Sequence, residues 1–218
     1  LGILDQLIAQ YPDAGEVHYA KALLYGQARN FPVAIPAAAE AYKLEPKNLV
    51  YANYLLELYK GSNDLAGALR LLDDLVASYP ANPQIVREKI FLLQASKQSD
   101  LALATYEEAV KLFGKSDTLD VMKSEILLDQ HKEDEALQLL KPWEEKNTGI
   151  RQVYSLLAFL NLQNKNSKEA VRVLEKGIVN TKDDILYLDL ADAYAANKKD
   201  KQAFESLKTA FNSSKVEF

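Results

Sequence analysis

Residues 51–80 read YANYLLELYKGSNDLAGALRLLDDLVASYP, and this stretch decides the fold. Its first part, residues 51–59, carries apolar side chains near helical spacing, and residues 61–64 form a short polar turn. A second apolar segment is led by Ala68 and stops near Pro80. Asp64 suits the start of a helix, and two helices joined by a few residues lie antiparallel. The stretch therefore predicts one helical hairpin.

The same phrase returns along the whole chain with a nearly constant period. A small residue leads each copy, at Ala34, Ala68, Ala102, Ala136 and Ala170, each 34 residues apart, and at Ala203 after 33. A second column agrees, at Pro12, Pro46, Pro80 and then Gly114. A short side chain lets two helices approach closely while larger neighbours fill the groove. Because one hairpin cannot cover its own apolar face, the next covers it, and the hairpins stack.

This pattern resembles the tetratricopeptide repeat (TPR) family. Three further columns of the sequence support the resemblance. Tyr25, Tyr59 and Tyr194 share one place on the first helix of a repeat; Ala22, Ala158 and Ala191 share its small place; Ala41, Ala109, Gly177 and Ala210 share a small place on the second helix. The resemblance covers nearly the whole chain. It implies an all-α fold, an α-solenoid of antiparallel helix hairpins (a TPR superhelix) with about 13 helices.

We expect a single solenoid domain over residues 1–218. Residues 1–13 are expected to form the second helix of a truncated repeat. Six full repeats follow, at 14–48, 49–82, 83–116, 117–150, 151–183 and 184–218. Because the chain begins at Leu1 inside a helical pattern, we expect it to be a piece of a longer protein.

The fourth repeat departs most from the pattern. Pro142 lies inside its second helix, where proline removes a hydrogen bond and clashes one turn back. Trp143, the only tryptophan, takes a place where most repeats have Ala or Gly. One interpretation is a kink or break near residues 141–143, with Trp143 wedged between repeats four and five. The alternative is a harmless local repacking.

The bulk composition excludes several classes of protein. A chain that is 48% hydrophobic and 26% charged is typical of a folded protein. The net charge of −5 offers no basic patch for a phosphate backbone, so nucleic acid is not an expected partner. No apolar run is long enough for a membrane span. The absence of cysteine removes thiolate metal sites and is compatible with the cytoplasm or the periplasm.

No catalytic constellation can be recognised. His18 is interpreted as a packed residue and His131 as a solvated turn residue, and no HExxH motif is present. The FGKS sequence at 113–116 lacks the upstream glycine of a phosphate loop. We therefore expect no enzyme, no metal and no cofactor.

The resemblance implies where a partner binds. First helices of the repeats line a concave inner face, and the candidate residues on it are Tyr19, Leu23, Asn53, Glu57, Arg87, Phe91, Val121, Glu125, Phe159 and Asp192. Apolar Leu23, Phe91 and Phe159 alternate with acidic Glu57, Glu125 and Asp192. This alternation predicts a groove for an extended or helical segment that carries apolar and basic side chains. The alternative is that the carboxylates only solvate the face and that neighbours partly bury the aromatics.

The predicted function is a protein–protein interaction scaffold within a larger protein. Some members of the family hold the C-terminal carboxylate of chaperones with Lys, Asn and Arg; here Tyr19 and Leu23 take such places and Glu88 repels a carboxylate, so that role is not expected. Two alternatives stay open. The chain is the recognition arm of a multidomain enzyme, or it self-associates through the solenoid ends, where Leu1, Ile3, Leu4, Leu7 and Ile8 form an amphipathic helix. The Lys- and Asn-rich later turns favour a bacterial source.

Overall fold

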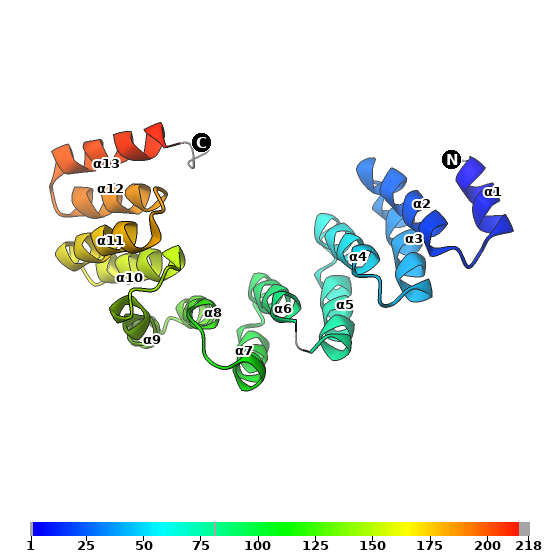
Figure 1. Cartoon of the computed structure of the whole chain (residues 1–218), viewed down its shortest axis with the longest axis horizontal. Coiled ribbons are helices and arrows are strands. Elements are labelled where there is room, and N and C mark those ends of the chain that lie inside the picture. The colour runs from blue at the N-terminus through cyan, green and yellow to red at the C-terminus, as the bar shows by residue number, and fades with distance from the viewer. Residues whose placement is uncertain (1, 81, 214–218) are drawn as a thin grey trace. The chain divides into compact units, whose positions relative to one another are not determined.

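The computed structural model describes residues 2–80 and 82–213, which form thirteen α-helices and no strand (Figure 1). The helices are α1 (Gly2–Gln10), α2 (Gly15–Gln27), α3 (Phe31–Leu44), α4 (Leu49–Gly61), α5 (Leu65–Ser78), α6 (Pro83–Ala95), α7 (Ser99–Phe113), α8 (Asp117–Asp129), α9 (Glu133–Glu145), α10 (Arg151–Gln163), α11 (Ser167–Thr181), α12 (Leu186–Ala196) and α13 (Asp200–Asn212). The predicted all-α solenoid of helix hairpins is confirmed.

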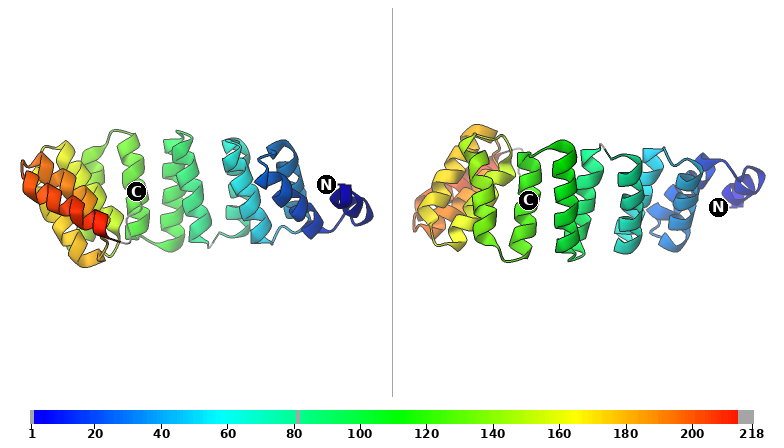
Figure 2. Two further views of the ribbon diagram at one scale, coloured as in Figure 1. Left: turned by 90° about the horizontal axis from the view of Figure 1, so that it is seen from above. Right: turned by 90° about the horizontal axis from the view of Figure 1, so that it is seen from below.

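The helices fall into two compact units, each of which is described by itself. Unit 1 (residues 1–97) contains α1 to α6, and unit 2 (residues 98–218) contains α7 to α13. Within each unit, successive helices pack side by side (Figures 1 and 2). The boundary falls in the turn between α6 and α7, inside the stretch 83–116 that the period marks as one repeat.

The small residues of the period lie where helices cross. Ala34, Ala68, Ala102, Ala136 and Ala170 are fully buried, and Ala203 is also buried. The second column of small residues is also buried; it consists of Ala41, Ala109, Gly177 and Ala210. At Gly177 of α11, an added Cβ would lie 2.6 Å from Cγ of Tyr154, so only glycine lets α11 press against the Tyr154 ring on α10. The spacing of short side chains therefore sets the closeness of the helices.

The turn inside each hairpin has one conformation throughout. Its central residue has a positive φ of 53–61° in all six hairpins, and none of these residues is glycine. These residues repeat with the period of the chain: Arg29, Asn63, Lys97, His131, Lys165 and Lys198. Asn147 and Lys182, which also have positive φ, lie between hairpins. Side-chain caps help to start two of the second helices, α5 and α11. Asp64 accepts a 2.8 Å hydrogen bond from the amide of Gly67, as the sequence indicates.

Of the two interpretations of the fourth repeat, a break of the helix near residues 141–143 is wrong. Helix α9 continues through Pro142 to Glu145, and the amide of Lys146 still donates to the carbonyl of Pro142 at 3.1 Å. Pro142 lies in the last turn, and the carbonyl that loses its partner belongs to Gln138, an exposed residue that water can reach. Trp143 is half-buried against the core of unit 2, and its indole binds back to Asp120 on α8.

Candidate functional site

The candidate residues of unit 1 lie on the first helices α2, α4 and α6, and three of them line one cleft. Asn53 and Glu57 of α4 and Arg87 of α6 border a cavity of about 270 Å³, with Leu72 and Leu75 of α5 beneath it. We call this cavity the inner cleft. Asn53 and Glu57 are one helical turn apart, so both point to the same side of α4.

A lysine bridge crosses the inner cleft. Nζ of Lys60 on α4 lies 3.0 Å from Glu57 and 2.9 Å from Glu88 of α6. Hydrogen bonds to Glu88 and Glu57 raise the pKa of Lys60, so this lysine stays charged. With Arg87 the cleft holds two carboxylates and two cations, and it is not the acidic surface that Glu57 alone suggests. Because such half-exposed pairs are weak, an incoming cation can compete with Lys60.

Tyr19 and Leu23 contribute less surface than the alternation suggests. The ring of Tyr19 lies 4.7 Å from the ring of Tyr51 and 5.5 Å, edge to face, from that of Tyr54. Leu23 is half-buried. Tyr19 therefore belongs largely to the packing between α2 and α4.

Phe91 is the most exposed apolar residue among the candidates. Its side chain is 58% exposed on α6, one turn beyond Arg87 and so on the same side of the helix. A large apolar side chain in contact with water marks a site where binding removes surface from solvent. Arg87 of the inner cleft and Phe91 therefore present a polar and an apolar group on one side of α6.

In unit 2 the candidates divide into buried and exposed residues. Val121 on α8 is only 6% exposed and belongs to the hydrophobic core, so it offers a partner no surface. Glu125 on α8, Phe159 on α10 and Asp192 on α12 are exposed. Although Glu125 is exposed, neighbouring protein atoms reduce the hydration of its carboxyl group. This desolvation, followed by the charge of Asp129, raises the pKa of Glu125.

The sequence pattern did not single out two residues of the inner cleft, Lys60 and Asn82. Lys60 stands three residues after Glu57, a spacing at which helical ion pairs form, so the pattern could have indicated the neutralised charge. Asn82 caps α6 by accepting a 3.0 Å hydrogen bond from the amide of Gln84, and it lines the cleft. Its second role becomes visible only when α4 and α6 are side by side.

The described residues contain no group of three His, Cys, Asp or Glu side chains placed to hold a metal ion. His18 binds the carbonyl of Pro12 at 2.8 Å, and His131 is 91% exposed in a turn. Among residues 2–80 and 82–213, no helix is long and apolar enough to cross a membrane.

Comparison with known proteins identifies the repeat. Residues 1–48 match the family model of the tetratricopeptide repeat. The helical hairpins also superpose on solved tetratricopeptide repeat structures. Residues 1–48 thus match the tetratricopeptide repeat in sequence, and the chain has the fold of the tetratricopeptide repeat structures. No curated protein gives a significant match to this chain.

Three of the similar solved structures illustrate the fold. A tetratricopeptide repeat protein from Parabacteroides merdae is 18% identical, with a TM-score of 0.64 over 94% of this chain and 80% of that one. PilW, described as a widely conserved type IV pilus biogenesis factor, is 15% identical, with a TM-score of 0.62 over 91% and 93%. YrrB, described as a TPR protein with an unusual peptide-binding site, is 17% identical, with a TM-score of 0.54 over 89% and 97%. At these identities the likeness shows the fold alone.

Proposed function

We propose that this protein is an interaction scaffold that binds a segment of another protein in the inner cleft of unit 1. The observation that carries the proposal is that Asn53 and Arg87 line one cleft, while exposed Phe91 lies one turn beyond Arg87 on the same side of α6. The described peptide-binding site of YrrB, which has the same fold, supports a scaffold role.

The chemistry of the inner cleft indicates the partner. Asn53 is exposed, and its amide can both donate to and accept from the backbone of an extended segment. Phe91 offers an apolar contact. Glu57 and Glu88 share one lysine, so a partner's Arg or Lys can pair with a carboxylate when Lys60 turns toward the other. We expect a partner segment with an apolar and a basic side chain.

A peptide selection tests this proposal. Short random peptides displayed on phage are selected on the immobilised full chain, and recovered peptides are measured by fluorescence anisotropy. The double variant Asn53→Ala with Phe91→Ala is expected to weaken binding about tenfold or more, because truncated interface anchors cost over ~1 kcal/mol. Leu112→Ala is the matched control, since Leu112 in unit 2 has the same 58% exposure as Phe91. Equal affinity for the double variant and the wild type would show that the inner cleft is not the site.

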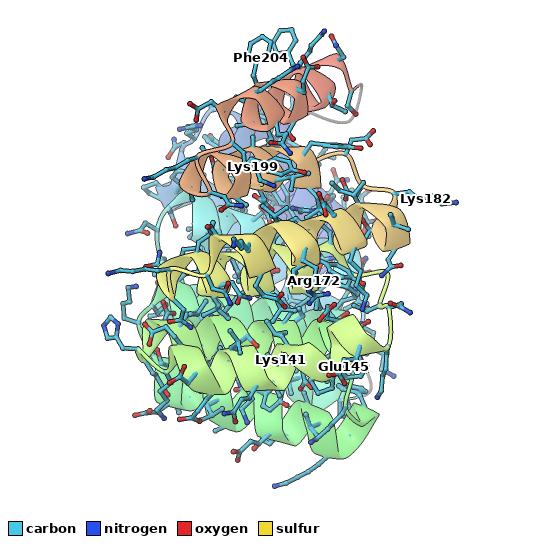
Figure 3. All side chains as sticks on the ribbon, turned by 90° about the vertical axis from the view of Figure 1, so that its left-hand side faces the viewer. Lys141, Glu145, Arg172, Lys182, Lys199 and Phe204 are labelled. Carbon is cyan, nitrogen blue, oxygen red and sulfur yellow. The ribbon has the colours of Figure 1, made fainter. Side chains whose placement is uncertain are left out.

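Self-association is a second candidate, favoured by apolar residues on the outermost helices of the two units. Phe204 and Leu207 of α13 are 65% and 48% exposed, whereas their equivalents one repeat earlier, Val171 and Leu174, are buried beneath α12. Figure 3 shows Phe204 on the side of α13 that faces away from α12. On α1, Ile3 is 72% exposed. Leu1, which the sequence pattern places on the same apolar face, lies outside the described residues.

Light scattering over a range of concentrations tests self-association. If the end faces bind a second copy, the mean mass rises with concentration, and the double variant Phe204→Glu with Leu207→Glu stays monomeric. A wild-type mass that stays at the monomer value at every concentration rules this candidate out and leaves the inner cleft untouched.

A further inference from the structure

A second cleft lies in unit 2, on the other side of the first helices from the candidate face. It measures about 640 Å³ and is lined by α11, α12 and α13. Tyr187, Leu190 and Tyr194 form its α12 wall and follow one another on one face of the helix. At about 100° per residue, Asp192 points to the opposite side of α12. We call this cavity the outer cleft.

The preceding groove in unit 2 shows one way in which such a space is closed. Between α9 and α11, the carboxylate of Glu144 lies 3.2 Å from Arg172 and 2.9 Å from Lys176. Lys176 also donates to the carbonyl of Glu144 at 2.8 Å. The side chain of Glu144 is only 8% exposed. This ion triad fills the groove between the two second helices and ties them together; Figure 3 shows Arg172 on the side of α11 that faces α9.

The period of the chain replaces every member of that triad in the outer cleft. Ile178 stands 34 residues after Glu144, and Glu205 and Thr209 stand 33 residues after Arg172 and Lys176. An aliphatic side chain, a carboxylate and a hydroxyl cannot form the triad. The groove therefore stays open, and Val179 on its edge is 72% exposed.

Charge at the edge of the outer cleft favours a basic partner. Glu175 and Glu205 face a single cation, Lys201, which leaves a net charge of −1 among the lining side chains. The hydroxyl of Tyr194 donates to Glu175 at 2.6 Å, and this hydrogen bond and burial raise the pKa of Tyr194 to about 12. The hydrogen bond thus holds Glu175 in place. Glu205 is the equivalent, one repeat later, of Arg172, the residue that reaches across the preceding groove to Glu144.

We propose that the outer cleft binds a partner segment that inserts an apolar side chain against Ile178 and Leu190 and pairs an Arg or Lys with Glu205. One repeat earlier, the ion triad fills the groove with side chains and pairs a cation with a carboxylate. In the outer cleft the partner supplies both: an apolar side chain that fills the groove, and a cation for Glu205. This site is separate from the inner cleft in residues, unit and helix face, so either can fail without the other.

The same phage-selected peptides test the outer cleft. Peptides that bind there are expected to contain an apolar and a basic residue. Glu205→Lys should weaken them about tenfold, and changing the basic residue of the peptide to Glu should restore binding to that variant. Val179→Asp should weaken them as well. Both sites are exposed, so the variants are expected to fold, which circular dichroism checks.

Glu108→Lys is the matched control for charge, because Glu108 is exposed on α7 of unit 2 and does not line the outer cleft. It should leave affinity unchanged. If no recovered peptide responds to Glu205→Lys or Val179→Asp, the inference is overturned, including when no peptide is recovered. Peptides that respond only to the Asn53→Ala and Phe91→Ala double variant would support the inner cleft and overturn the outer one.

Discussion

The indole Nε1 of Trp143 donates a 2.9 Å hydrogen bond to Oδ2 of Asp120, a carboxylate that is only 3% exposed. Oδ1 of the same carboxylate accepts a 2.7 Å bond from the hydroxyl of Tyr106. Asp120 stands where the next two repeats have Tyr154 and Tyr187, so here two aromatic side chains from α7 and α9 bind a polar group on α8. Burial, followed by the bond to Asp120, raises the pKa of Tyr106, which therefore remains a donor.

Removing this acceptor should destabilise unit 2. Asp120→Ala leaves the buried Tyr106 hydroxyl and the half-buried Trp143 indole without their acceptor, which costs about 2–4 kcal/mol of unfolding free energy for the two groups. Asp120→Asn keeps one acceptor oxygen and should cost less. Urea denaturation followed by tryptophan fluorescence measures both. A change below about 0.5 kcal/mol for Asp120→Ala would mean that the network adds nothing.

Adding one methyl group at Gly177 should separate α11 from α10. The new Cβ of Gly177→Ala would lie 2.6 and 2.7 Å from the Cγ and Cβ atoms of Tyr154, which is fully buried and cannot move aside. We expect a loss of about 1–3 kcal/mol in thermal or urea unfolding. Gly149→Ala is the control, because an added Cβ there meets nothing within 4 Å. Equal stability of the two variants would contradict the close approach at Gly177.

Glycine in a hairpin turn should stabilise the protein. Lys165 has φ +58°, a conformation that costs a non-glycine residue about 1–2 kcal/mol and costs glycine nothing. After the entropy that glycine adds to the unfolded chain, Lys165→Gly should gain about 0.5–1 kcal/mol. Lys208→Gly, in the exposed face of α13, should instead lose roughly 1 kcal/mol. Differential scanning calorimetry would refute this argument if both variants lost stability.

Acidification should weaken the ion triad of Glu144, Arg172 and Lys176, which joins α9 to α11. Burial by itself raises the pKa of Glu144, but hydrogen bonds and charges from Arg172 and Lys176 outweigh burial and lower the pKa below the ordinary 4.5. A carboxyl whose folded pKa is lowered stabilises the fold above its unfolded pKa, and this stability is lost as pH falls through the folded value. Stability should therefore drop below about pH 4.5.

The variant Glu144→Gln isolates this contribution. It should be less stable than the wild type at pH 7, and the two proteins should converge on acidification. Urea midpoints measured from pH 7 to pH 3 provide the comparison. Parallel pH profiles for the two proteins would show that the triad does not contribute in this way.

The sequence predicted the fold well because the decisive property is the size of single residues. Ala34 and Ala102 are buried because two helices cross there, and the same crossing occurs once in every repeat. Depth within the fold was harder to predict. The register of α8 gives the side on which Val121 lies, but its burial depends on how closely the neighbouring helices approach.

Charge pairing and cavities also depend on distances that the sequence does not contain. Glu57 was expected to attract a cation, yet Lys60 already occupies that position and joins it to Glu88, which lies 31 residues further along the chain. The outer cleft could be recognised only after Glu144 was seen to bind Arg172 and Lys176, since the later loss of that triad is what leaves the groove open.

Hydrogen–deuterium exchange of the full chain, with and without a selected peptide that needs Asn53 and Phe91, tests the scaffold proposal most directly. Binding in the inner cleft should slow exchange in α4 from Asn53 to Lys60 and in α6 from Gln84 to Phe91. Exchange that slows elsewhere while both of these segments stay unchanged would contradict the proposed site.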